Sequence, residues 1–142
     1  DNVHKMLTHP SALLGLSDGG AHVGTICDAS FPAYLLSHWT RDREYDRIAL
    51  ARAVQMLSAD AADYLGLADR GRIAVGQRAD LNVIDYDRLS LRPPRMVQDL
   101  PAGGQRLLQP ARGFLATLVA GEAVIKNDEV TAARPGRLVR FN

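Results

Sequence analysis

The chain has 142 residues, and its hydrophobic fraction of 46% and charged fraction of 23% are those of an ordinary globular domain. With 17 basic and 16 acidic residues, the formal net charge of +1 gives no electrostatic reason to expect nucleic acid or a membrane surface as a partner. Cys27 is the single cysteine, so no disulfide can form within the chain, and a reducing cytoplasmic setting is the simplest expectation. No apolar run approaches the length of a membrane span.

The first part of the chain has the pattern of an α/β unit. Residues 2–9 show helical spacing, and Pro10 ends that helix. The apolar run 12–17 has no polar alternation, which predicts a strand buried on both faces, as in a parallel sheet. The small and glycine-rich residues 19–30 then predict a loop.

Helices are expected after this loop. Ser30 and Pro32 suit the start of a helix that runs to about Thr40. Asp46 can cap a second helix over 47–57. Ser58 can cap a further short helix, which Gly66 would end.

After Gly66 the pattern becomes that of strands and turns. Residues 71–85 predict two short strands joined by a glycine turn, and 85–110 form an irregular, proline-rich stretch. Residues 114–139 return to strands, with turns at 120–121 and 127–128. The predicted fold class is therefore an α/β front part followed by a β-rich part.

One segment carries candidate chemistry, the run Gly15-Leu16-Ser17-Asp18-Gly19-Gly20-Ala21-His22. A buried strand that ends in an acid before a glycine loop places the acid at the C-terminal mouth of a sheet, where α/β barrels keep catalytic residues. A carboxylate there can bind a divalent metal and take a proton from metal-bound water. Asp-Gly is also a common turn pair, and the pattern alone favours a plain turn.

A second segment, Gly71 to Asp85, is best interpreted on its own residues as structural. Its pattern Gly-x-Ile-x-x-Gly-x-x-Ala-Asp-Leu-x-Val-x-Asp nevertheless resembles the hallmark of the small β-sandwich that accompanies the barrel in the amidohydrolase superfamily. Segments 16–22, 99–104 and 133–137 are similar to N-acyl-D-amino-acid deacylases. This resemblance covers nearly the whole chain. It implies that residues 1–66 are the C-terminal end of a metal-dependent (β/α)8 TIM-type barrel and that residues 67–142 are the C-terminal part of the sandwich, an incomplete fragment of the full fold.

The resemblance also implies a reaction and a site. The family protein hydrolyses the amide of an N-acyl-D-amino acid, a small-molecule substrate, with zinc or another divalent metal. Asp18 matches its general base, which lies beside the metal and later donates a proton to the leaving amine. His22, Gly19 and Gly20 lie in the following loop and are candidates for contact with substrate. A structural role is favoured for Cys27 and for the other histidines, and the arginines of 134–140 are interpreted as a solvated edge, with a substrate carboxylate as the alternative.

The main departure from the family is an absence, since the chain has no His-x-His pair. A barrel needs roughly 250 residues, and a catalytic zinc takes three protein ligands, so Asp18 alone cannot hold it. We therefore expect the metal in a full-length parent and none in the isolated chain, which is predicted to be inactive. A cut barrel is expected to associate with itself or with its missing N-terminal part. The alternatives are a hydantoinase-like or dipeptidase-like amidohydrolase and a non-catalytic scaffold or interaction module.

Overall fold

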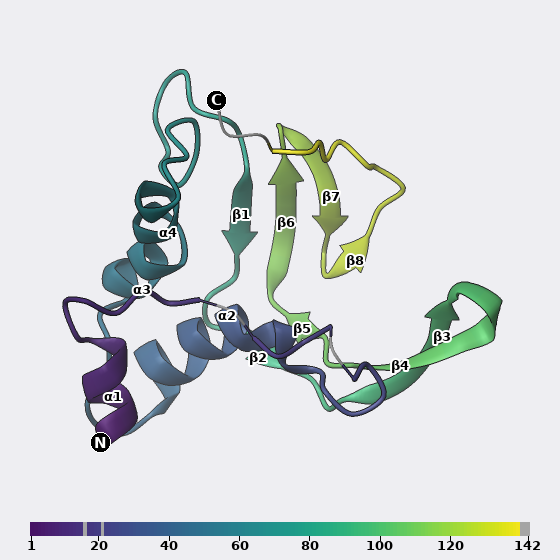
Figure 1. Cartoon of the computed structure of the whole chain (residues 1–142), viewed down its shortest axis with the longest axis horizontal. Coiled ribbons are helices and arrows are strands. Elements are labelled where there is room, and N and C mark those ends of the chain that lie inside the picture. The colour runs from purple at the N-terminus through teal and green to yellow at the C-terminus, as the bar shows by residue number, and fades with distance from the viewer. Residues whose placement is uncertain (16, 21, 140–142) are drawn as a thin grey trace.

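The computed structural model describes residues 1–15, 17–20 and 22–139. Helices occupy the front part of the chain and strands the back part (Figure 1). The helices include a π-helix, η2, that directly continues α2, and two short 3₁₀ turns. Their bounds are α1 Asn2–Leu7, η1 Asp28–Ser30, α2 Phe31–Tyr34, η2 Leu35–Asp42, α3 Leu50–Leu57, α4 Ala59–Tyr64 and η3 Pro101–Gly103. None of the helices in the described residues is long and apolar enough to cross a membrane.

The strands pair only in antiparallel fashion in the described part of the chain. One sheet has the order β1-β6-β7-β8, and two further pairs are β2-β5 and β3-β4. The β3-β4 hairpin extends from the body as an arm (Figure 1). The strand bounds are β1 Leu81–Ile84, β2 Ser90–Leu91, β3 Arg95–Leu100, β4 Gly104–Leu108, β5 Ala111–Arg112, β6 Phe114–Val119, β7 Glu122–Lys126 and β8 Glu129–Val130.

Two tight turns set the register of the sheet. Ala120 and Gly121 both have positive φ, 52° and 82°, and join β6 to β7. Asn127 and Asp128 do the same between β7 and β8, with φ of 49° and 68°. Successive positive φ angles match the right-handed twist of paired strands, which is why short hairpins use them. Both turns predicted from the sequence are confirmed.

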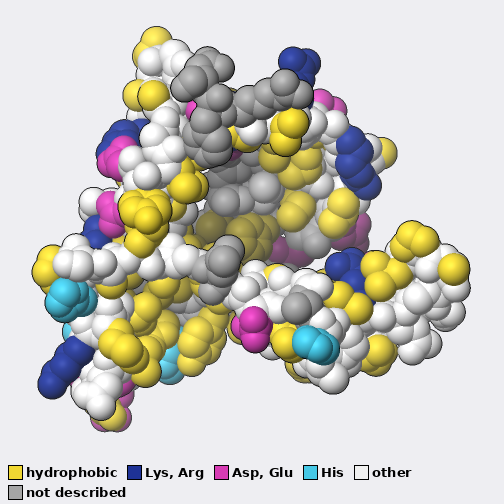
Figure 2. All heavy atoms as spheres, in the orientation of Figure 1, with side chains coloured by type: hydrophobic (Ala, Val, Ile, Leu, Met, Phe, Trp, Pro, Cys, Tyr) yellow, Lys and Arg dark blue, Asp and Glu magenta, His cyan; other side chains and the backbone are white. Residues whose placement is uncertain are grey.

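The hydrophobic core lies where the helices meet the connection between β1 and β2. Leu89, in that connection, and Ala53, in α3, are fully buried. Strand residues Ile84 and Phe114 pack partly buried against the same cluster. The remaining buried members come from α2, η2, α3 and the turn before α3: Ala33, Leu35, Leu36, Ile48 and Met56. Figure 2 shows further hydrophobic side chains around the hollow between helices and sheet.

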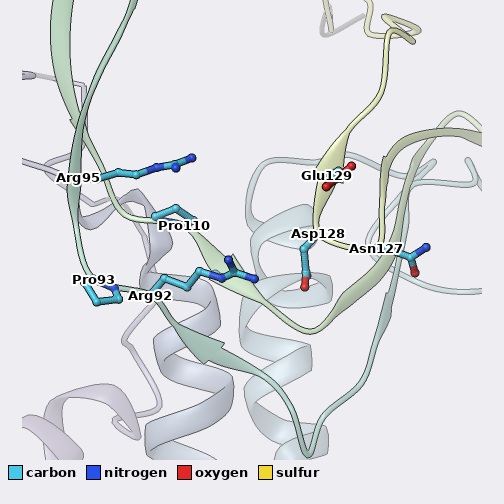
Figure 3. A pocket seen from close by; sticks show the side chains of 8 residues that line it. Arg92, Pro93, Arg95, Pro110, Asn127, Asp128 and Glu129 are labelled. Carbon is cyan, nitrogen blue, oxygen red and sulfur yellow. The ribbon is translucent and has the colours of Figure 1, made fainter.

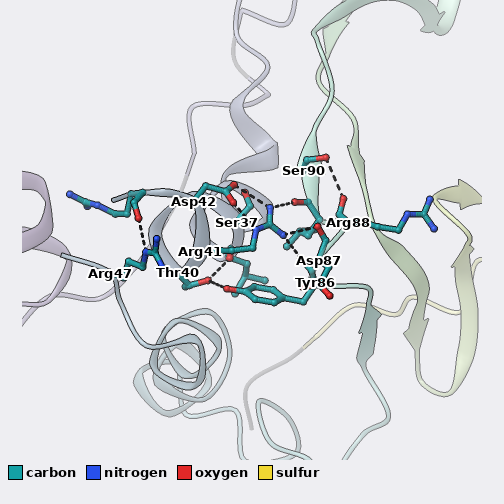
Figure 4. A network of polar contacts seen from close by, with 12 residues as sticks. Ser37, Thr40, Arg41, Asp42, Arg47, Tyr86, Asp87, Arg88 and Ser90 are labelled. Atoms are coloured by element: carbon teal, nitrogen blue, oxygen red, sulfur yellow. Dashed lines mark hydrogen bonds and ion pairs between the residues drawn. The ribbon is translucent and has the colours of Figure 1, made fainter. Parts of the chain in front are cut away.

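A polar network joins the end of η2 to the segment after β1 (Figure 4). The Arg41 guanidinium donates to the carbonyl oxygens of Tyr86, Asp87 and Leu89 and also pairs with the Asp42 carboxylate. The hydroxyl groups of Thr40 and Tyr86 lie 2.6 Å apart and share a hydrogen bond. Because Arg41 satisfies several carbonyl groups at once, it ties the helical part to the strands.

The expected buried strand at 12–17 is wrong for its described residues. Leu16 lies outside the described residues, and the others belong to no strand of the sheets. Leu13 is 40% exposed. An apolar run becomes a parallel strand only beside neighbours that accept its hydrogen bonds, and no strand of the described chain pairs with it.

Four other expectations are corrected. The first of the two strands predicted within 71–85 does not form, and Ile73 and Val75 there are 89% and 107% exposed. The stretch 85–110, predicted as irregular, contains the strands β2, β3 and β4. Of these, β2 pairs with β5, which lies just after the stretch. Asp46 caps no helix, because its φ is 51° and α3 begins only at Leu50 after Ala49. Beyond β8, residues 131–139 form no strand.

Candidate functional site

The predicted catalytic carboxylate, Asp18, is exposed at the start of the glycine loop. Its backbone N–H donates to the Asp28 carboxylate, with an N–Oδ2 distance of 3.3 Å. The Ser17 hydroxyl accepts the N–H of Gly19 at 3.2 Å, which fixes the turn just after Asp18. The acid is therefore open to solvent while its backbone is held from the far side of the loop.

The two glycines after Asp18 have different roles in this turn. A Cβ at Gly19 would lie 3.0 Å from the Cβ and from the N of Ala29. Only a residue without a side chain therefore lets η1 approach this closely. Gly20 has a φ of 115° with open space around it, so its requirement is conformational. Both positions shape the loop, whereas their predicted contact with substrate stays a prediction.

His22 is also exposed, with a φ of 48°. Its carbonyl oxygen accepts the N–H groups of Thr25 and Ile26, which closes a local turn. Within the described residues, no hydrogen bond joins the imidazole of His22 to the carboxylate of Asp18. Its predicted role toward substrate stays a prediction.

The loop is anchored to the β3-β4 arm by hydrogen bonds between residues that lie some eighty positions apart in sequence. The N–H of Leu107, in β4, donates to the carbonyl oxygen of Val23 at 2.7 Å. The Ser30 hydroxyl donates to Oε1 of Gln109 at 2.6 Å in a half-buried contact. The sequence indicated Ser30 only as a helix start and did not mark Asp28 or Gln109, since no local pattern identifies partners that lie apart in sequence.

The described residues do not form a complete metal centre by themselves. Among them, no three side chains of His, Cys, Asp or Glu come together in a way that would hold an ion. A catalytic zinc takes three protein ligands, so Asp18 would need ligands from outside this chain. That a metal is held only in a full-length parent stays a prediction.

A concave region, away from the Asp18 loop, lies between the β3-β4 arm and β8 (Figure 3). It has a volume of about 410 Å³. Arg92 and Arg95 extend into it from one wall, opposite Asp128 and Glu129 (Figure 3). An adjoining hollow of about 550 Å³ has an apolar floor that includes Phe114. Asp128 already accepts the N–H of that phenylalanine at 2.7 Å, so one of its oxygens serves the strand pairing.

Known proteins are similar to this chain along most of its length. A protein-family model described as amidohydrolase family matches residues 1–125. An N-acyl-D-glutamate deacylase of Alcaligenes xylosoxydans xylosoxydans is 33% identical over 143 aligned residues, which cover 99% of this chain and 26% of the relative. An uncharacterised protein of Mycobacterium tuberculosis is 33% identical over 94 residues, or 63% of this chain and 15% of the relative.

A shorter match is an adenine deaminase of Desulfatibacillum aliphaticivorans, 41% identical over 62 residues, or 44% of this chain and 10% of the relative. The chain thus spans about a quarter of the deacylase and less of the other two relatives. No solved structure matches it significantly.

Proposed function

Because the chain belongs to the amidohydrolase family, we propose that it is the C-terminal part of a hydrolase that cleaves the amide C–N bond of N-acyl-D-amino acids. The products are a carboxylate and a free D-amino acid. The observation that carries the proposal is the match to an N-acyl-D-glutamate deacylase over 99% of the chain. The match to an adenine deaminase covers only 44% of the chain, which favours deacylation over deamination as the proposed reaction.

In this proposal Asp18 is the acid–base group. Its carboxylate takes a proton from the attacking water and returns it to the amine nitrogen as the C–N bond breaks, so one residue serves both steps. Its exposure at the start of a fixed glycine loop supports the role, because a substrate can reach it. His22, Gly19 and Gly20 would line the substrate side of the same loop.

The parent would carry zinc or another divalent ion, whose charge lowers the pKa of a bound water. Asp18 would be one ligand, and residues outside this chain would supply the others. Residues 1–66 would complete the barrel and 67–142 the β-sandwich, so the isolated chain would be inactive. Self-association or pairing with the rest of the parent would then cover exposed side chains such as Ile73 and Val75. The proposed compartment is the cytoplasm.

The test uses the full-length parent and a panel of N-acyl-D-amino acids and their L-enantiomers, with a dihydropyrimidine, a dipeptide and adenine alongside. Asp18→Asn should lower kcat by about a thousandfold or more, since general acid–base catalysis contributes roughly 10²–10⁴ per step. Asp46→Asn makes the same change at another exposed carboxylate and should leave kcat unaltered. Hydrolysis of a different C–N bond, or full activity in Asp18→Asn, would contradict the proposal.

A further inference from the structure

Asp18 has no strand beneath it in the described residues, so contacts within the loop must hold it in place. One of them is the hydrogen bond from the Asp18 N–H to the Asp28 carboxylate. Asp28 is the first residue of η1, ten positions further along the chain. The turn that carries the candidate acid is therefore closed by a side chain from the other end of the same loop.

Packing reinforces this closure. The backbone at Gly19 approaches Ala29, the middle residue of η1, so closely that a Cβ would lie 3.0 Å from the alanine N and Cβ. A shift of η1 toward Gly19 is therefore opposed by this packing, and the hydrogen bond from Asp18 to Asp28 opposes a shift away from it.

η1 is in turn fixed from outside the loop. Its last residue, Ser30, donates to Gln109 Oε1 at 2.6 Å, and this contact is half-buried. Gln109 lies directly after β4, which pairs with β3 in the arm. The N–H of Leu107 holds Val23 at a second point of the loop. The arm thus positions both the middle and the end of the segment that carries Asp18.

We propose that Asp28 and Gln109 are positioning residues for Asp18, acting through η1. Neither needs to touch the substrate. Asp28 orients the Asp18 backbone directly, and Gln109 holds Ser30 and hence Asp28. The inference rests on the proposed function for its catalytic consequence, whereas its structural part depends only on the contacts of the loop.

The kinetic test uses the full-length parent and whichever amide it hydrolyses fastest. Asp28→Ala and Gln109→Ala should each lower kcat by about 10- to 100-fold with little change in KM, because misplacement of a catalytic group by about 1 Å can cost roughly 10². Asp28→Asn and Gln109→Glu retain an oxygen that accepts the same hydrogen bond and should restore most of kcat. The matched control Gln105→Ala, exposed in β4, should leave kcat unchanged.

A second measurement is independent of activity. Hydrogen–deuterium exchange of the parent should show faster uptake in peptides covering 17–30 for Gln109→Ala and Asp28→Ala, and wild-type uptake for Gln105→Ala. If the parent hydrolyses no N-acyl amino acid, the proposed function fails while this exchange result still decides the positioning. Unchanged exchange, unchanged kcat in a hydrolysing parent, or equal losses in Asp28→Ala and Asp28→Asn would overturn the inference.

Discussion

The Arg41 guanidinium donates through Nη2 to the carbonyl oxygen of Leu89 at 2.7 Å. This contact joins the last turn of η2 to the fully buried residue between β1 and β2. The same side chain reaches the carbonyl groups of Tyr86 and Asp87 and lies 5.3 Å from the centre of the Tyr86 ring (Figure 4). The Arg41 side chain thus links the helices to the segment between β1 and β2, in addition to the hydrophobic core that both share.

Replacement of Arg41 by Ala should lower the free energy of unfolding by about 2 kcal/mol, since hydrogen bonds to charged groups contribute roughly 1.5–3 kcal/mol. Three carbonyl groups lose this charged donor, although that of Tyr86 keeps the N–H of Leu89. Arg41→Lys should recover less than half, because an ammonium group lacks the planar fork. Urea denaturation measures both. Asp42→Ala is the control, since it breaks only the exposed ion pair and should cost less than about 1 kcal/mol.

Leu89 is fully buried, so Leu89→Ala should cost about 2–5 kcal/mol through lost burial and a residual cavity. Leu138→Ala removes the same atoms from a side chain that is 79% exposed and should change stability by less than about 0.5 kcal/mol. Paired urea titrations give the comparison. Similar losses at the two positions would show that Leu89 is not at the centre of the core.

Gly113 has a φ of 105°, and a Cβ there would lie 2.9 Å from the Cα of Leu89. Gly113→Ala should therefore destabilise by about 3 kcal/mol or more, from backbone strain of roughly 1–3 kcal/mol plus a backbone clash. Gly76→Ala is the matched control, because its φ is 87° but no atom lies within 4 Å. Gly76→Ala should lose only the stability that backbone strain costs. Equal losses of stability in the two variants would exclude a contribution from the clash with Leu89.

Asp80 should make stability depend on pH in the acid range. Burial opposes ionisation of its carboxyl, but the N–H of Ala120 and the Arg78 guanidinium outweigh that effect and hold its pKa below the ordinary 3.8. A carboxyl with a lowered folded pKa stabilises the fold above its unfolded pKa, and this contribution is lost as pH falls through the folded value.

Wild type should therefore exceed Asp80→Asn in free energy of unfolding at pH 7, and the difference should shrink below pH 3.8. Urea midpoints of both proteins at neutral pH and near pH 3 test this, because the other carboxyls contribute equally to the two proteins. A difference that is constant with pH would contradict the assignment.

Local sequence accounts for the elements that carry their own signals. Periodic apolar residues and breakers predicted α1, the end of α3 at Leu57 and the short helix between Ser58 and Gly66. The turn pairs at 120–121 and 127–128 placed the hairpins of the main sheet. These features depend on residues close together in the chain, so a linear pattern contains them.

Elements that need distant partners were not predictable in this way. The run 12–17 has the composition of a buried strand but no neighbour in the described structure. The 85–110 stretch, despite its prolines, forms strands because β3 folds onto β4 and β2 meets β5. In both cases the backbone hydrogen bonds come from another segment, which a local pattern does not reveal.

The candidate site likewise has some features that the sequence indicated and others that depend on the tertiary structure. Residue type and order made Asp18 a candidate, although its pattern alone favoured a plain turn. The resemblance of this segment and of the Gly71–Asp85 pattern to the amidohydrolase superfamily predicted the family, which the match over residues 1–125 confirms, and the role of Asp18 stays a prediction. What holds that acid was decided only by the tertiary structure. Asp28 is ten residues from Asp18, and Ser30 is 79 residues from Gln109. The contact between Ser30 and Gln109 forms only once the arm has folded back on the loop, and the one between Asp18 and Asp28 only once the loop has closed on itself, because side-chain hydrogen bonds depend on distance in space and not on distance along the chain.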